Sequence, residues 1–138
     1  MRAAATLCLL AVAAAGCGAA PRDSAQDFRG DERAVAAVVE RLESAARDNE
    51  PAVVCSRLLS ERLLAALRAQ GTNCRSAVRD GFRDADSIEL TVEDVEIRGT
   101  RASASVVYRS RSEDRTTTLQ LEREGNAWKI SSLGATPA

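Results

Sequence analysis

Residues 87–108 read SIELTVEDVEIRGTRASASVVY, and their apolar side chains alternate with polar ones. Because successive side chains of a β-strand point to opposite faces, this period of two predicts two strands separated by a turn at Gly99-Thr100. The alternation slips by one residue at Glu93-Asp94, which predicts a β-bulge in the first strand. The stretch therefore predicts a bent antiparallel hairpin with one apolar face.

Two more strands follow this hairpin. The alternation resumes after a loop at residues 110–113 and again after a turn at residues 124–126. The pattern predicts four antiparallel strands in a meander. The side chains expected on the apolar face of the last two strands are Thr117, Leu119, Leu121, Trp128 and Ile130.

Helical spacing of apolar residues dominates the chain before the sheet. A first helix is expected from its N-cap Asp31 to the stop signals that precede Pro51. Two short helices are expected at residues 52–59 and 61–69, and a further one at residues 73–82. Helices followed by an antiparallel sheet predict an α+β fold, with N-terminal helices packed on one face of a curved four-stranded sheet.

The N-terminus has the composition of a secretion signal. Arg2 precedes an uncharged run at residues 3–15, which is too short to cross a membrane, since a spanning helix needs about 20 apolar residues. Residues 14–17 read AAGC and resemble the bacterial lipobox, in which the cysteine sulfur receives a diacylglycerol and the chain is cut just before it. The resemblance implies a signal peptide at residues 1–16 and a lipid on Cys17. The alternative is an ordinary signal peptide with an incidental cysteine.

The chain after the signal peptide divides into a tether, a domain and a tail. Residues 18–30 mix Gly, Ala, Pro, Ser and charges without periodicity, as expected of a flexible linker. Together with the lipidated cysteine they form a segment at residues 17–30, which a domain at residues 31–134 and a tail at residues 135–138 follow. Two acyl chains hold a protein firmly on a bilayer, so the expected location is the outer face of the plasma membrane.

Outside the cytoplasm, Cys55 and Cys74 are expected to form a disulfide. The alternative is two buried thiols, and a zinc site is disfavoured because the chain has no histidine. One straight helix over residues 52–69 would carry the chain about 20 Å from Cys55, whereas bridged Cα atoms lie within about 7 Å of each other. The bridge therefore predicts a bend, and Ser60 is placed to cap a new helix that begins at Glu61.

Charge and composition argue against several classes of partner. The 19 basic residues nearly balance the 20 acidic ones, and aromatic residues make up 3% of the chain. Neither bulk electrostatic attraction nor base stacking therefore supports nucleic-acid binding. Arginines crowd the second and third strands, where they either hold an anionic envelope polymer or lipid head group or form a solvated face. These arginines are Arg98, Arg101, Arg109, Arg111 and Arg115.

Two phrases carry a family resemblance. Residues 122–133 read EREGNAWKISSL, and residues 55–67 read CSRLLSERLLAAL, with a cysteine after the next glycine-containing turn. With the order of elements, the first phrase resembles the nuclear transport factor 2-like superfamily, which includes SnoaL-like cyclases and ketosteroid isomerase. The second resembles secreted actinobacterial lipoproteins of this kind. The resemblance covers residues 31–134 and implies a cystatin-like fold in which sheet and helices enclose a cone-shaped cavity.

This resemblance also implies where a ligand would bind. Catalytic relatives place an acid or base in the cone, but this chain has no histidine and a single tyrosine. Asp94 and Tyr108 are left as weak catalytic candidates. Small Ala102 and Ala104 leave room in the cone for a ligand. The expected lining residues of the pocket are Tyr108, Thr117, Leu119 and Trp128.

The sequence as a whole favours a membrane-anchored extracytoplasmic lipoprotein that is not an enzyme. Its domain is expected to bind a small apolar ligand or an envelope protein, without a cofactor or metal. The alternative is an extracytoplasmic SnoaL-like isomerase or cyclase that uses an acid or base in the cone. A homodimer through the outer sheet face is a further possibility, and it would cover Val107.

Overall fold

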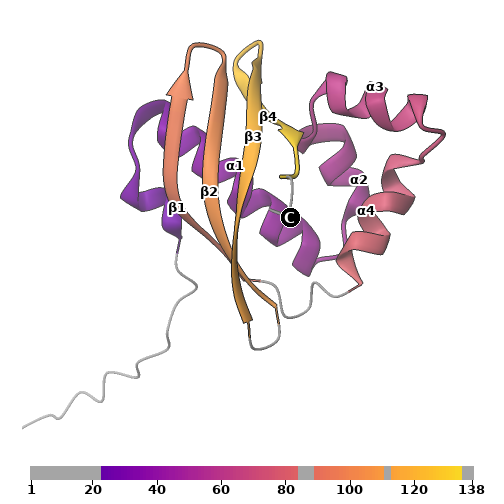
Figure 1. The fold of residues 1–138 in the computed structure, drawn as a ribbon, viewed down its shortest axis with the longest axis horizontal. Helices are drawn as coiled ribbons and strands as arrows, with labels where there is room; N and C mark the ends of the chain where they lie inside the picture. Colours follow the sequence, from indigo (N-terminus) through magenta and orange to yellow (C-terminus); the bar gives the residue numbers. More distant parts are fainter. Residues whose placement is uncertain (1–22, 84–88, 111–112, 135–138) are drawn as a thin grey trace, which may run out of the picture.

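The computed structural model describes residues 23–83, 89–110 and 113–134, which build a four-stranded antiparallel sheet with helices on one face (Figure 1). The predicted α+β fold is confirmed. The predicted signal peptide, Cys17, Arg111 and the predicted C-terminal tail lie outside the described residues.

The sheet is the predicted meander, with the strand order β1-β2-β3-β4. The register of β1 against β2 shifts between Val92 and Asp94, so the predicted β-bulge is present. Because the bulge inserts one extra residue, Val92 and Val95 are both buried on the same side of the sheet. The strands are β1 Glu89–Arg98, β2 Arg101–Ser110, β3 Glu113–Glu124 and β4 Ala127–Ser132.

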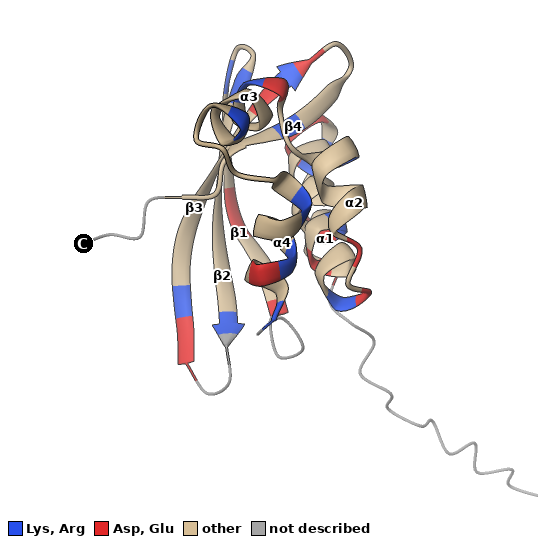
Figure 2. Ribbon diagram, turned by 90° about the vertical axis from the view of Figure 1, so that its right-hand side faces the viewer, with Lys and Arg blue, Asp and Glu red and all other residues tan. Residues whose placement is uncertain are grey.

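Helical segments form the second layer, which Figure 2 shows from the side next to the sheet. The longest of them, α1, crosses behind the strands in Figure 1, and α3 and α4 lie beyond β4. The segments are the 3-10 turn η1 Ser24–Asp27, α1 Gly30–Arg47, α2 Pro51–Val53, the π-helical turn η2 Val54–Leu58, α3 Glu61–Ala69 and α4 Cys74–Phe82.

Two predicted helix boundaries are wrong. The N-cap of α1 is Arg29 and not Asp31, whose carboxylate instead pairs with Arg123 of β3 at 2.6 Å. The predicted helix at residues 52–59 is α2 followed by η2, and Leu59 is already extended because it pairs with β4. The pairing of Leu59 with β4 ends the second helix early, and a local sequence pattern does not reveal such a contact.

Ser60 forms the predicted bend between η2 and α3. Its hydroxyl accepts a hydrogen bond from the Leu63 N–H at 3.2 Å and so caps α3. Its own N–H donates to the Ile130 carbonyl oxygen at 2.9 Å, which joins the helical layer to the edge of β4. Ser60 is fully buried, and these bonds pair its N–H as a donor and its hydroxyl oxygen as an acceptor.

Side chains of the helical layer also occupy the open edge of β1. The Leu90 N–H donates to Glu43 Oε2 at 3.0 Å, and the Val92 N–H donates to Ser24 Oγ at 3.3 Å. Ser24 and Ala25 are buried, and η1 contacts both α1 and β1. The prediction of a flexible linker up to residue 30 is wrong for residues 24–27, because the buried Ser24 and its hydrogen bond from the Val92 N–H hold η1 against β1.

Glu40 lies where η1 meets α1. Its Oε1 accepts a hydrogen bond from the Ala25 N–H at 2.7 Å, and its carboxyl group also shares a hydrogen bond with Asp23. Burial, followed by this contact with Asp23, raises the pKa of Glu40. The hydrogen bond with Glu40, followed by one from Gln26, lowers the pKa of Asp23. As the pH falls, the first proton taken up by the two carboxyl groups therefore goes preferentially to Glu40.

The substitution Glu40→Gln is expected to raise stability more near pH 7 than near pH 4. When the pKa of a carboxyl group is higher in the folded than in the unfolded state, the group stabilises the fold fully below its unfolded-state pKa, which is about 4.3 for Glu. This stabilisation is lost as the pH rises through the folded-state pKa. The lowered pKa of Asp23 acts in the opposite sense, and this stability is lost as the pH falls. Glutamine keeps an acceptor for the Ala25 N–H and carries no charge.

Thermal unfolding followed by circular dichroism at both pH values measures the change in Tm. Glu93→Gln is the control, because Glu93 is an exposed carboxyl group of β1. Equal changes in Tm at the two pH values would contradict the assigned role of Glu40.

Candidate functional site

The predicted disulfide between Cys55 and Cys74 is present and attaches α4 to η2, with the two Cα atoms 6.1 Å apart. Asn73 caps α4 by accepting a hydrogen bond from the Ser76 N–H at 3.1 Å. The helix contacts α2, η2 and α3, and none of its residues is fully buried. The helix is thus held mainly by its N-terminal end and by its helical neighbours.

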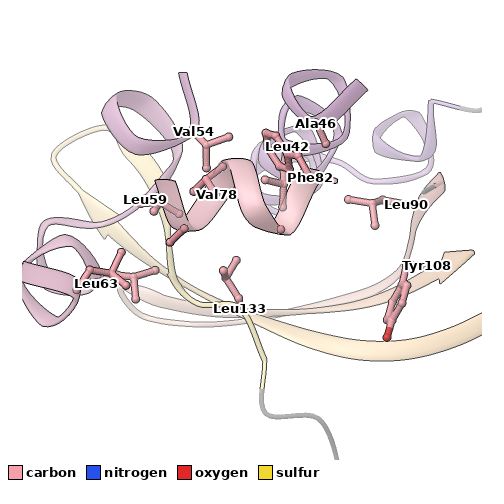
Figure 3. A pocket seen from close by; sticks show the side chains of 13 residues that line it. Leu42, Ala46, Val54, Leu59, Leu63, Val78, Phe82, Leu90, Tyr108 and Leu133 are labelled. Atoms are coloured by element: carbon pink, nitrogen blue, oxygen red, sulfur yellow. The ribbon is translucent and has the colours of Figure 1, made fainter. Parts of the chain in front are cut away.

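An apolar cavity of about 340 Å³ lies between α4 and the sheet (Figure 3). This volume falls within the range of small-molecule sites in proteins. The cavity is lined by Leu42 and Ala46 of α1, Val54 and Leu59 near η2, Leu63 and Leu67 of α3, Ala77, Val78, Gly81 and Phe82 of α4, Leu90 and Tyr108 of the sheet, and Leu133 after β4.

Tyr108 is the one lining residue whose side chain carries a polar group. Figure 3 shows its hydroxyl pointing away from the helices. Arg115 lies opposite Tyr108 on β3, and Glu113, followed by the Tyr108 hydroxyl, raises the pKa of the Arg115 guanidinium. The cavity therefore offers hydrocarbon walls, and a charged group inside it would find no partner among the lining side chains.

Asp94, the other catalytic candidate, lies elsewhere. It is exposed at the bulge, opposite Ser105 of β2, and does not line the cavity. Ser105 alternates with the buried Ala104 and Val106, so it belongs to the sheet face turned away from the helices. The structure does not bring Asp94 and Tyr108 together. Within residues 23–83, 89–110 and 113–134, no group of three potential metal-ligating side chains occurs.

The cavity is not where the sequence places the pocket. Of the four predicted lining residues, Tyr108 borders it and the other three do not. Leu119 and Trp128 are core residues that are 5% and 4% exposed. Thr117 lies beside the backbone of Gly134, because a Cβ atom on that glycine would meet the Thr117 hydroxyl oxygen.

The small side chains of β2 explain this difference. α1 packs on β1 and β2, and Val35 and Val39 of α1 belong to the same buried cluster as Ala102 and Ala104. Small residues on the strand thus let the helix approach, and they leave no room for a ligand. Two features of the sequence pointed to the observed site. These are the apolar residues of the predicted helix at residues 73–82 and the predicted disulfide that attaches this helix to Cys55.

Three of the predicted sheet arginines, Arg98, Arg109 and Arg115, pair with neighbouring carboxylates. Arg109 binds Asp114 through Nε at 2.7 Å and Nη2 at 3.1 Å, and Arg115 binds Glu113 at 2.9 Å. Arg98 is paired in the same way within β1. Figure 2 shows basic and acidic positions side by side at the ends of β2 and β3. These exposed pairs support the interpretation of a solvated face.

Replacing both Cys55 and Cys74 by Ser is expected to lower the free energy of unfolding by about 3 kcal/mol, because the bond closes a loop of this length in the unfolded chain. Urea denaturation without reductant measures the loss. Reduction of the wild-type protein should cause the same loss, while reductant should leave the double variant unchanged. A loss below about 1 kcal/mol would show that the packing of α4 does not need the bond.

One comparison with known proteins agrees with this architecture. The sequence matches no protein-family model and no curated protein. A de novo designed NTF2 fold protein, NT-9, is similar in structure, with a TM-score of 0.50 over 76% of this chain and 87% of that chain. The chain has a nuclear transport factor 2-like fold. The sequence identity is 13%, so the likeness concerns the fold, and activity has to be argued from the site.

Proposed function

We propose that the protein is an extracytoplasmic lipoprotein whose nuclear transport factor 2-like domain binds a small apolar ligand in the cavity beneath α4. The lipid on Cys17 would hold it at the outer face of the plasma membrane. The domain would act as a binding module and not as an enzyme. No helix in the described part of the chain is both long and apolar enough to span a bilayer.

The lining of the cavity is the observation that carries this proposal. Its walls come from α1, the η2 region, α3, α4 and the sheet, and their side chains are apolar except for Tyr108. Burying an apolar ligand against such walls is favourable by about 25 cal/mol for each Å² removed from water. The cavity is also partly open, since Leu133 on its border is 54% exposed.

The disulfide supports the proposed location. Bonds of this kind persist in oxidising compartments and are rare in the cytosol. The Cys55–Cys74 bond therefore agrees with export of the chain, which the apolar run at residues 3–15 and the lipobox-like residues 14–17 suggest independently.

The enzyme alternative receives less support from the site. An isomerase or cyclase of the SnoaL-like kind needs an acid or base inside the cavity. Asp94 lies on the far face of the sheet, and the Tyr108 hydroxyl points away from the helices. A binding role requires neither group inside.

The substitution Cys17→Ser is expected to abolish membrane association in a bacterium that processes lipoproteins. The wild-type protein should enter the detergent phase of a Triton X-114 separation, and the variant should stay in the aqueous phase. The matched control replaces Cys55 and Cys74 by Ser and retains Cys17, so it should follow the wild type. A Cys17→Ser protein that still enters the detergent phase would refute the proposed anchor.

The substitution Gly81→Phe is expected to weaken binding of the neutral fluorophore N-phenyl-1-naphthylamine by at least about tenfold, or ~1.4 kcal/mol. Gly81 borders the cavity, and a Cβ atom there would meet no heavy atom within 4 Å. A large side chain can therefore enter the site without a backbone clash.

Gly81→Ala is the matched control for this test. Both substitutions remove a helical glycine, which favours α4 by up to about 1 kcal/mol, so neither is expected to unfold the domain. The alanine variant should bind the fluorophore as the wild type does. Unchanged binding by the phenylalanine variant would place the fluorophore outside the cavity.

A further inference from the structure

The cavity extends beneath α4 from α3 to the start of β1 and the end of β2, where Leu90 and Tyr108 lie. Figure 3 shows Leu63 at one end of the lining, Leu90 and Tyr108 at the other, and Val78 and Phe82 between them. A lining drawn out in this way fits an extended ligand better than a compact one.

The walls favour a hydrocarbon chain with its polar group outside. Apart from Phe82, Tyr108 and Gly81, the lining residues are aliphatic. A charged head group inside would lose its hydration without gaining a partner. Tyr108 lines the cavity with its ring and directs its hydroxyl away from the helices, near Arg115. Tyrosine suits a boundary of this kind, with one end apolar and the other wet.

The N-terminal segment joins the domain at the same end of the cavity. Ser24 Oγ accepts its hydrogen bond from the Val92 N–H, two residues along β1 from Leu90. Asp23 lies six positions after Cys17 in the sequence, and an extended chain spans at most about 3.6 Å per residue. The cysteine to which a lipid would be attached would therefore lie within about 20 Å of Asp23.

We infer that the cavity takes a single acyl chain, which enters beside Leu90 and Tyr108 and leaves its head group outside. This inference rests on the proposed ligand-binding function. The chain belongs either to the lipid on Cys17 of the same molecule or to a neighbouring membrane lipid. Both sources present the same hydrocarbon to the walls, and an experiment can separate them.

The first test measures competition for the cavity by chains of increasing length. The protein is the chain from residue 17 onward, carrying Cys17→Ser and the intact disulfide, with bound N-phenyl-1-naphthylamine. The competitors are saturated monoacylglycerols, with adamantanol as a compact apolar control. Affinity is expected to rise about fourfold for each added methylene and to level off once the cavity is full. Adamantanol is expected to compete weakly.

Variants of α4 test whether the competition takes place in the cavity. With Gly81→Phe, affinity should level off at a shorter acyl chain. Arg79→Phe puts the same side chain on an exposed position of α4 outside the lining and should leave the length dependence unchanged. If the fluorophore binds but monoacylglycerols do not displace it, or if affinity is independent of chain length, the inference is overturned and the proposed function stands. If neither the fluorophore nor any monoacylglycerol binds, both are overturned.

The second test identifies the source of the chain. Leu133, which borders the cavity and is exposed, is replaced by the photoactivatable p-benzoylphenylalanine in the lipidated protein on phosphatidylcholine vesicles. Mass spectrometry after irradiation distinguishes a crosslink to the lipid on Cys17 from the added mass of a phosphatidylcholine. Either crosslink supports the inference. Crosslinks to protein alone, or none, would overturn it.

Discussion

The bond between Cys55 and Cys74 determines where α4 begins, and the cavity depends on that position. The helix has no fully buried residue, and its packing against the core comes from the partly buried Cys74, Val78 and Phe82. Loop closure of this length contributes about 3 kcal/mol in a domain whose total stability is of order 5–15 kcal/mol. A covalent attachment of this strength lets α4 form the wall of a cavity without collapsing onto the sheet.

Ser60 connects the disulfide-bonded helices to the sheet. The bridge can form because the chain turns at Ser60, where the hydroxyl caps α3 and the N–H binds Ile130 of β4. The same residue therefore fixes the direction of α3 and the distance of the helical layer from β4. Because Leu63 of α3 lines one end of the cavity, this junction also positions that end of the site.

Features that depend on local pattern or chain length could be predicted from the sequence. The period of two gave the meander, the phase slip at Glu93-Asp94 gave the bulge, and the reach of a disulfide gave the bend. Features that depend on contacts between the helices and the sheet could not be predicted in this way. Asp31 forms an ion pair with the sheet and does not cap its helix.

The candidate site was predicted less well for the same reason. Ala102 and Ala104 suggested empty space, but the volume near a small side chain depends on what packs against it, and here that is α1. Tyr108 was found because it is the sole tyrosine of the chain. The wall made by α4 depends on how far that helix stands from the sheet, which no stretch of sequence encodes alone.

The docked turn η1 has a consequence for how the protein behaves in concentrated solution. Unpaired strand edges act as templates for pairing with other chains. Ser24 and Glu43 occupy N–H groups on the rim of β1, and Ser60 takes a carbonyl on the rim of β4. A fragment trimmed to begin at residue 31 would uncover the Val92 N–H, so the turn η1 protects this edge of the domain against self-association.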